Sequence, residues 1–197
     1  MADFDLIVRN GRIVTEDRQI DGDVGVRDGR IVAVEPGLKG TGSREIDAGG
    51  KFVLPGGIDS HVHIEQKSGM GVMCADDFYS GTVSAAFGGT TTVIPFAAQH
   101  RGMKLRQVVK DYHEAATPKA VIDYGFHLII TDPTPQALGQ DLPALIRDGY
   151  TSFKIYMTYD AMKVSDYQIL DILALARRDG ALVMVHAENH EIGRAHV

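Results

Sequence analysis

Short apolar runs recur about thirty residues apart along the second part of the chain, and segments with helical periodicity separate several of them. The runs are rich in β-branched residues, which favours strands. Strands that alternate with helices at this spacing are typical of βα units and a parallel sheet. The five predicted strands are Ile58–Ile64, Thr91–Phe96, Val121–Ile130, Ser152–Tyr156 and Leu182–His186.

Three helices are predicted between these strands. Asp76-Asp77 can cap a first helix, which Gly88-Gly89 would end. Ser165 and Gln168 form a potential capping box for another, which Gly180 would end. The remaining helix is indicated by apolar residues at helical spacing on one face, Leu105, Val108, Val109, Tyr112 and Ala116. Five strands are more than half of an eight-stranded barrel but cannot close one.

The first part of the chain, residues 1–54, carries β-rich runs joined by turn residues. Asn10-Gly11 and Asp28-Gly29 each stand between two apolar runs. These dipeptides supply the positive φ angles that tight hairpin turns require. The pattern predicts a small antiparallel β module with no obvious catalytic cluster of its own.

The last six residues, 192–197, carry no apolar periodicity. They also match the translation of a common sequencing-adapter read-through. We therefore expect them to be a non-native tail, the alternative being an ordinary chain boundary, and we assign no function to His196.

Composition narrows the class of protein. With 197 residues, of which 44% are hydrophobic, the chain can bury a core, and it contains no evident signal peptide or transmembrane run. Its net charge is −6 with acids and bases interspersed, which argues against nucleic-acid binding. The single cysteine, Cys74, excludes an intrachain disulfide and favours a reducing cytoplasm.

Two histidines, His61 and His63, end the first predicted strand of the second part. Side chains at i and i+2 of a strand point to the same face, so the pair can bind one metal, and neutral imidazole is a good zinc ligand. The alternative is a pair of satisfied core or surface histidines. Asp59 could orient one of these rings or could simply lie at the strand end.

Lys154 stands between Phe153 and Ile155 in a predicted parallel strand, where an unpaired cation is costly to bury. It could lie in water on an edge strand, or in a buried ion pair. Beside the histidines, a neutral amine that has captured carbon dioxide is a further interpretation, because the carbamate is an anionic metal ligand. His186 ends the next strand and completes an ordered series. We predict only structural roles for the remaining histidines, His100, His113, His127 and His190.

These features resemble the cyclic amidohydrolases, specifically the dihydropyrimidinase and D-hydantoinase group. The motifs that carry the resemblance are Pro55–His63, Gly88–Thr91, Ser152–Lys154 and His186–Asn189, and it extends from Asp5 to about Glu191. It implies an α/β fold: the N-terminal part of a TIM (β/α)8 barrel, truncated after about the fifth strand, plus a small N-terminal β-sandwich module. Residues 1–54 would then be part of a composite β-sandwich, and residues 55–191 the first five βα units of the barrel.

The resemblance also implies a site. His61, His63 and N6-carboxylated Lys154 would hold one Zn2+, and Lys154 would bridge to a second Zn2+ that His186 also binds. Tyr159 matches a tyrosine that binds the substrate carbonyl or its oxyanion, the alternative being a loop residue that covers the barrel rim. Two further ligands, on the sixth and eighth strands, lie outside these residues.

The activity implied is metal-dependent hydrolysis of the cyclic amide bond of dihydropyrimidines or 5-substituted hydantoins to N-carbamoyl amino acids. The parent protein would act on a small cyclic ureide or imide and form a homotetramer, with no nucleic-acid or membrane partner. Allantoinase or dihydroorotase activity is one alternative, although Met70, Val72 and Met73 could form an apolar pocket wall that favours the first activity. A non-catalytic dihydropyrimidinase-like structural protein is another.

Overall fold

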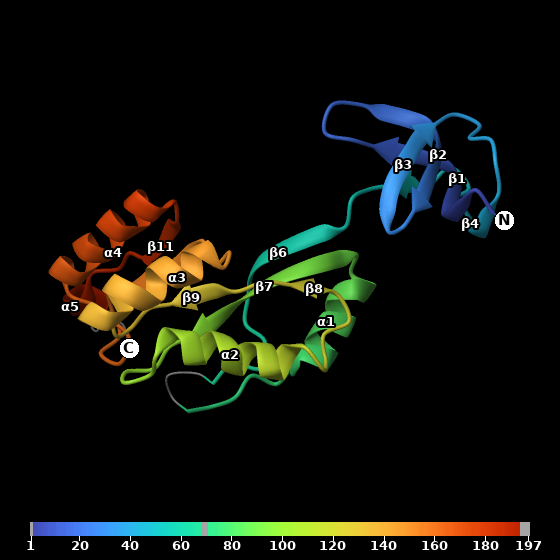
Figure 1. The fold of residues 1–197 in the computed structure, drawn as a ribbon. Helices are drawn as coiled ribbons and strands as arrows, with labels where there is room; N and C mark the ends of the chain where they lie inside the picture. Colours follow the sequence, from blue (N-terminus) through green and yellow to red (C-terminus); the bar gives the residue numbers. More distant parts are fainter. Residues whose placement is uncertain (1, 68–70, 194–197) are drawn as a thin grey trace. The chain divides into compact units, whose positions relative to one another are not determined.

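The computed structural model describes residues 2–67 and 71–193, and the chain divides into two compact units, Met1–Gly56 and Gly57–Val197 (Figure 1). The first unit is a mixed sheet in the order β3-β2-β1-β4, with β5 also paired to β1. Its strands are β1 (Phe4–Val14), β2 (Gln19–Arg27), β3 (Arg30–Glu35), β4 (Gly42–Asp47) and β5 (Phe52–Val53).

The prediction of an antiparallel module is wrong in two respects. β4 and β5 run parallel to β1, and Asn10-Gly11 lies inside β1 rather than in a hairpin turn. Asn10 has a φ of 57°, and the pairing register shifts between Val8 and Gly11, as in a β-bulge. Its N–H donates to the buried Asp23 carboxylate at 2.8 Å, so the strand continues past the bulge.

The Asp28-Gly29 turn joins β2 to β3 as predicted, with φ angles of 51° and 69°. Both residues adopt the left-handed conformation that a two-residue hairpin turn of type I′ requires. The same kind of dipeptide therefore makes a turn at one position and a bulge at the other, because only Asn10 has a buried carboxylate to receive its amide.

The second unit is a parallel sheet in the order β11-β10-β9-β7-β6, with β8 paired to β7. Its strands are β6 (Gly57–Val62), β7 (Thr90–Ala98), β8 (Asp123–Tyr124), β9 (His127–Ile129), β10 (Ser152–Tyr156) and β11 (Leu182–His186). The strand predicted at Val121–Ile130 is interrupted: the Gly125 N–H donates to the Val93 carbonyl, and β8 and β9 pair with successive parts of β7. The predicted α/β fold class, part of a barrel with a separate N-terminal sheet, is confirmed.

The helices are α1 (Phe78–Phe87), α2 (Leu105–Ala116), α3 (Leu142–Arg147), α4 (Asp166–Asp179) and α5 (His190–Gly193), with a π-helical turn η1 (Ala137–Asp141) before α3. Asp77 and Ser165 cap α1 and α4, as predicted, and Gly180 ends α4 with a φ of 81°. Both caps are capping boxes, which the sequence indicates only for Ser165 and Gln168. The pattern does not predict η1 and α3, because this segment contains Gly139 and Pro143 and looks like a loop. Pro143 is tolerated because it lies in the first turn of α3.

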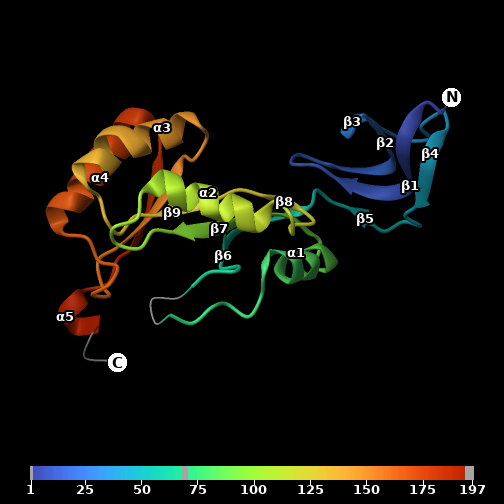
Figure 2. The same cartoon turned by 60° about the horizontal axis from the view of Figure 1, so that its bottom comes forward.

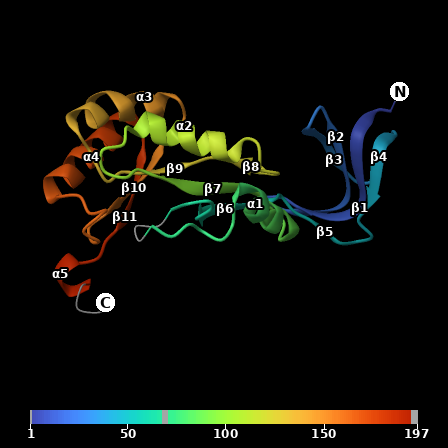
Figure 3. The same cartoon turned by 90° about the horizontal axis from the view of Figure 1, so that it is seen from below.

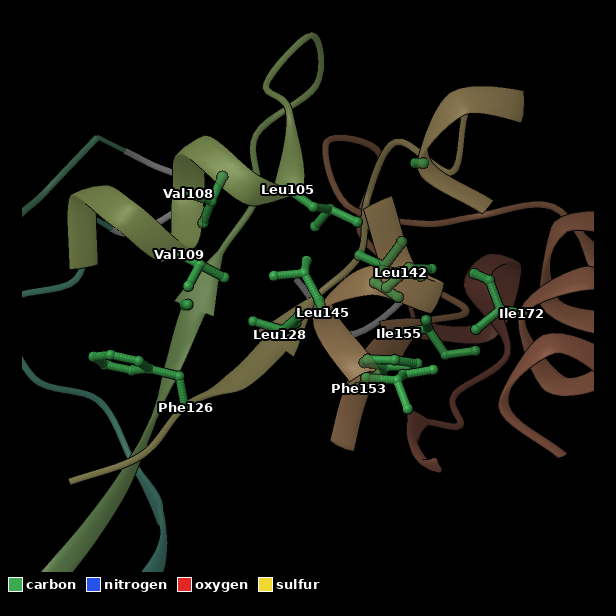
Figure 4. Packing of buried hydrophobic residues seen from close by; sticks show 14 of the residues in the cluster. Leu105, Val108, Val109, Phe126, Leu128, Leu142, Leu145, Phe153, Ile155 and Ile172 are labelled. Carbon is green, nitrogen blue, oxygen red and sulfur yellow. The ribbon is translucent and has the colours of Figure 1, made fainter. Parts of the chain in front are cut away.

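Helices α2, α3 and α4 lie along one face of the parallel sheet, and the described parts of the connection from β6 to α1 lie on the opposite side (Figures 2 and 3). The helix side holds the main apolar core, in which Leu128, Phe153 and Ile155 pack against residues of α2, α3 and α4 (Figure 4). The opposite face is therefore the one that would line the interior of the barrel.

Among the described residues, no helix is long and apolar enough to cross a membrane. The composite sandwich predicted for residues 1–54 stays a prediction, as does the barrel segment 55–191. The predicted tail, residues 192–197, lies mostly outside the described residues.

Candidate metal centre and active site

All four predicted metal ligands lie on the face of the parallel sheet that points away from the helices. Along β10, Phe153 and Ile155 are fully buried under the helices, so the intervening Lys154 points to the opposite face. His61 contacts Phe96, and His186 contacts Tyr156; both of these aromatic residues belong to a second apolar cluster on that opposite face. Because the strands are parallel, their carboxyl ends also share one edge of the sheet.

His61 and His63 lie side by side at the end of β6. Their ring centroids are 5.7 Å apart, and both rings pack on Phe96, at 4.7 Å and 5.0 Å. The His63 Nδ1 lies 2.6 Å from Gln66 Oε1, to which it donates, so its Nε2 keeps a lone pair for a metal. The Asp59 carboxylate accepts the backbone N–H of His61 at 3.1 Å. It therefore binds the backbone at the end of the strand and does not orient a histidine ring.

Lys154 lies in a row of the sheet between Ile129 of β9 and Met184 of β11. Its side chain is half-buried, and its Nζ is 5.4 Å from the centroid of the Tyr156 ring. No carboxylate pairs with Lys154 among the described residues. Among the described residues, Lys154 is therefore not in a buried ion pair.

His186 ends β11 directly beside Tyr156, its register partner on β10. The two rings stack with centroids 5.5 Å apart, and the Tyr159 ring lies 5.2 Å from His186 on another side. The His186 Nε2 is 3.0 Å from the Glu188 carboxylate. Tyr159, the predicted substrate-binding tyrosine, thus lies next to a predicted ligand, and its side chain is half-exposed.

The structure brings these residues together in pairs. His61 adjoins His63, and His186 adjoins Tyr159 and, through Tyr156, Lys154. Within residues 2–67 and 71–193, no three His, Cys, Asp or Glu side chains form a group that could hold a metal. The convergence of the four ligands on two metal ions stays a prediction.

A cavity of about 270 Å³ opens at this end of the sheet. Its lining joins His63 and Gln66, which follow β6, with Tyr156 and Met162 of the β10 strand and loop. Gln99 forms part of the cavity wall and is buried. Its side-chain amide binds backbone groups of both the β7 and β9 loops. Of the predicted apolar wall, Val72 and Met73 are exposed, and Met70 lies outside the described residues.

His127, for which the sequence indicates only a structural role, connects three strands beneath this site. It lies on β9, and its ring binds the Ser60 carbonyl of β6 and the Ser152 hydroxyl of β10. Only 7% of the residue is exposed. Burial lowers the pKa of His127, and the nearby His61 lowers it further. The hydrogen bond to the Ser60 carbonyl opposes this shift, but it is the smaller effect. A neutral ring meets both bonds, since Nε2–H donates to the carbonyl and Nδ1 accepts from the hydroxyl.

We expect His127 to make the full-length protein that contains this chain less stable in acid. Its pKa is lowered in the folded state, so the unfolded chain binds a proton that the folded chain does not, and stability falls as the pH drops below about 6.5. Urea unfolding at about pH 7.5 and about pH 5, in the wild type and in His127→Gln, measures this contribution. Glutamine does not titrate, so the variant should lose less stability between the two conditions; an equal loss in both proteins would contradict the assignment.

Comparison with known proteins shows the family to which the chain belongs. The sequence profile of the amidohydrolase family matches residues 52–197. The D-hydantoinase of Geobacillus stearothermophilus is 44% identical over 188 residues, which cover 94% of this chain and 40% of that protein. The dihydropyrimidinase of Rattus norvegicus is 38% identical over 194 residues, covering 95% of this chain and 37% of that protein.

Solved structures agree with the sequence relatives. A D-hydantoinase structure matches with a TM-score of 0.92 and 42% identity, covering 98% of this chain and 42% of that chain. The L-hydantoinase of Arthrobacter aurescens matches with a TM-score of 0.81 and 30% identity, covering 98% of this chain and 42% of that chain.

This chain belongs to the amidohydrolase family. The resemblance to the dihydropyrimidinase and hydantoinase group is confirmed, and the chain spans about two fifths of the length of the curated relatives it matches.

Proposed function

We propose that the protein containing this chain hydrolyses the cyclic amide bond of dihydropyrimidines or 5-substituted hydantoins in a metal-dependent reaction that yields N-carbamoyl amino acids. The observation that carries the proposal is the placement of His61, His63, Lys154 and His186 on one face of the sheet, at or near the carboxyl ends of the strands. Active sites of barrel enzymes lie at this end. The names of the relatives, D-hydantoinase and dihydropyrimidinase, support the substrate class.

The donor types at this site, imidazole nitrogens and a carbamate, are ones that Zn2+ accepts. In this proposal His61, His63 and N6-carboxylated Lys154 would hold one Zn2+, and Lys154 and His186 would contribute to holding a second. The His63 tautomer set by Gln66 leaves Nε2 for the metal, and Lys154, without a carboxylate partner in the described chain, is available to react with carbon dioxide. Its amine attacks carbon dioxide and releases one proton, which leaves an anionic carbamate. When bound, the ions supply a Lewis acid and lower the pKa of water.

The other groups of the site bind and orient the substrate. The Tyr159 hydroxyl donates to the ring carbonyl and stabilises the negative charge that develops on it. The stack of Tyr156 on His186 restricts both rings, and Gln99 holds the β7 and β9 loops that shape the cavity. The single cysteine supports a cytoplasmic location, and the family resemblance supports a homotetramer.

Two alternatives make different predictions about activity. Allantoinase or dihydroorotase would use the same four ligands, whereas a non-catalytic dihydropyrimidinase-like structural protein has no need of them. The presence of all four argues for an enzyme.

A panel of substrates tests the proposal. The full-length protein should open dihydrouracil and 5-substituted hydantoins to N-carbamoyl amino acids faster than it opens allantoin or dihydroorotate, with products identified by mass spectrometry. Preferential turnover of allantoin or dihydroorotate would establish a sister activity instead, and zinc-loaded protein inactive on the whole panel would favour the structural role.

A further inference from the structure

Tyr159 has a backbone conformation that its side chain disfavours. Its φ is 70°, in the left-handed region, where a bulky residue is rare and strained. The other non-glycine residues with positive φ in the described chain are Asn10, Asp28 and Glu65. Such strain persists only where surrounding contacts hold it.

Contacts within its own loop hold part of Tyr159. Its carbonyl accepts the N–H groups of Met162 and Lys163, both at 2.8 Å. Its ring lies 6.1 Å from Tyr156 and 5.2 Å from His186. These contacts fix the carbonyl and the ring of Tyr159. They do not involve the side chains of Thr158 and Asp160, the residues directly before and after it.

His190 holds both of those neighbours. Its Nδ1 is 3.2 Å from the Thr158 hydroxyl, and its Nε2 is 3.2 Å from the Asp160 carboxylate. The contact with Thr158 is a hydrogen bond, and the contact with Asp160 is an approach of nitrogen and oxygen within ion-pair distance. The residues are well placed to be rigid: the His190 side chain is 13% exposed and Thr158 is 3% exposed. Asp160 also lies 3.2 Å from Lys163 Nζ, in an ion pair whose two side chains are far more exposed than His190.

We propose that His190 is a positioning residue that fixes Tyr159 in its left-handed conformation by binding the residues before and after it. This inference rests on the proposed function in that Tyr159 donates to the substrate carbonyl. His190 follows His186 by four residues, so the contact ties the loop after β10 to the segment that carries a proposed metal ligand. The contact thereby fixes the position of the Tyr159 hydroxyl relative to the proposed metal site.

A double-mutant cycle in the full-length protein separates positioning from general stability. His190→Ala should lower kcat roughly ten- to a hundredfold with little change in KM, because a small displacement of a group that acts on the transition state has an effect of this order. In the Tyr159→Phe background the same change should have almost no further effect, since the hydroxyl it positions is gone. An equal loss in both backgrounds would overturn the proposal.

Matched variants address folding and metal content. Thr158→Val removes the hydrogen bond to His190 without changing the side-chain shape, and it carries the test if His190→Ala does not fold. Lys163→Met removes the ion pair between Lys163 and Asp160 but leaves both contacts of His190 in place, so it should keep wild-type kcat. Zinc content, measured in every variant, should be unchanged; a loss of zinc in His190→Ala and Thr158→Val that accounts for the lost activity would place the effect at the metal and contradict the inference.

Limited proteolysis gives a readout that does not depend on the reaction. Chymotrypsin cleaves after tyrosine, and the ratio of cleavage after Tyr159 to cleavage after the exposed Tyr167 reports opening of the loop. His190→Ala should raise this ratio roughly tenfold, the change expected from the loss of one ordinary hydrogen bond, and Lys163→Met should not. An unchanged ratio would refute the positioning role of His190, whether or not the protein hydrolyses a cyclic amide. A raised ratio in a protein without activity would reject only the proposed function.

Discussion

Replacing Lys154 should remove most activity and most bound metal from the full-length protein. Lys154→Ala deletes the proposed bridging ligand, and we expect turnover of a 5-substituted hydantoin to fall by at least about a hundredfold. Loss of a residue that only orients a metal ligand typically costs up to about a hundredfold, so loss of a ligand itself should cost at least as much. Lys154→Arg should fail equally, because a guanidinium stays cationic and cannot become a carbamate. Zinc analysis and steady-state kinetics on the same samples measure both effects.

Chemical rescue supplies the control. A short carboxylic acid placed in the space left by Lys154→Ala offers the anionic oxygens of the carbamate, so it should restore part of the activity and of the zinc. It should restore nothing in Lys154→Arg, where the side chain still fills the space. Activity near that of the wild type in either variant would refute the carbamate.

The 197-residue polypeptide itself should show no turnover of dihydrouracil or 5-substituted hydantoins. In the described chain β6 pairs only with β7 and β11 only with β10, so both sheet edges are open. Apolar side chains at these edges are exposed, including Ile58 at 66% and Leu182 at 64%. The proposed second metal also lacks the ligands that the resemblance assigns to later strands. We expect poor solubility and less than one zinc per chain.

Purified polypeptide and full-length protein, assayed side by side, test this expectation. The comparison should be made at equal zinc-to-protein ratios, so that a difference reflects the missing strands rather than metal supply. Metal-dependent turnover by the 197 residues at a rate near that of the full-length protein would contradict it.

Much of the second unit can be predicted from local signals. The strands Ser152–Tyr156 and Leu182–His186 occur at the predicted residues, because a short apolar run between helices has few other ways to be buried. Helix α4 begins and ends where its capping box and Gly180 indicate, since these signals act within a few residues of the backbone they cap.

The failures have a common physical cause in contacts between distant residues. Asn10-Gly11 carries the sequence of a turn, but Asp23, thirteen residues away, receives the amide of Asn10 and makes it a bulge. Likewise η1 and α3 form despite Gly139 and Pro143, because Leu142, Leu145 and Ile146 are buried in the core.

The candidate site divides in the same way. The shared face of His61 and His63 follows from strand alternation and is visible in the sequence. Sequence reasoning missed the supporting residues: Gln66 for His63, His127 for the strands below, and His190 for Tyr159. Each acts through one or two polar contacts between side chains or with a backbone carbonyl, which the pattern of apolar and polar residues does not specify.

The most direct test of the account is removal and return of metal in the full-length protein, with a 5-substituted hydantoin as substrate and the N-carbamoyl amino acid as the measured product. Chelation should abolish product formation, and Zn2+ should restore it in the wild type but not in Lys154→Ala. Product formation that persists in the chelated, zinc-free protein, or an N-carbamoyl product that never forms in the zinc-loaded one, would contradict the account.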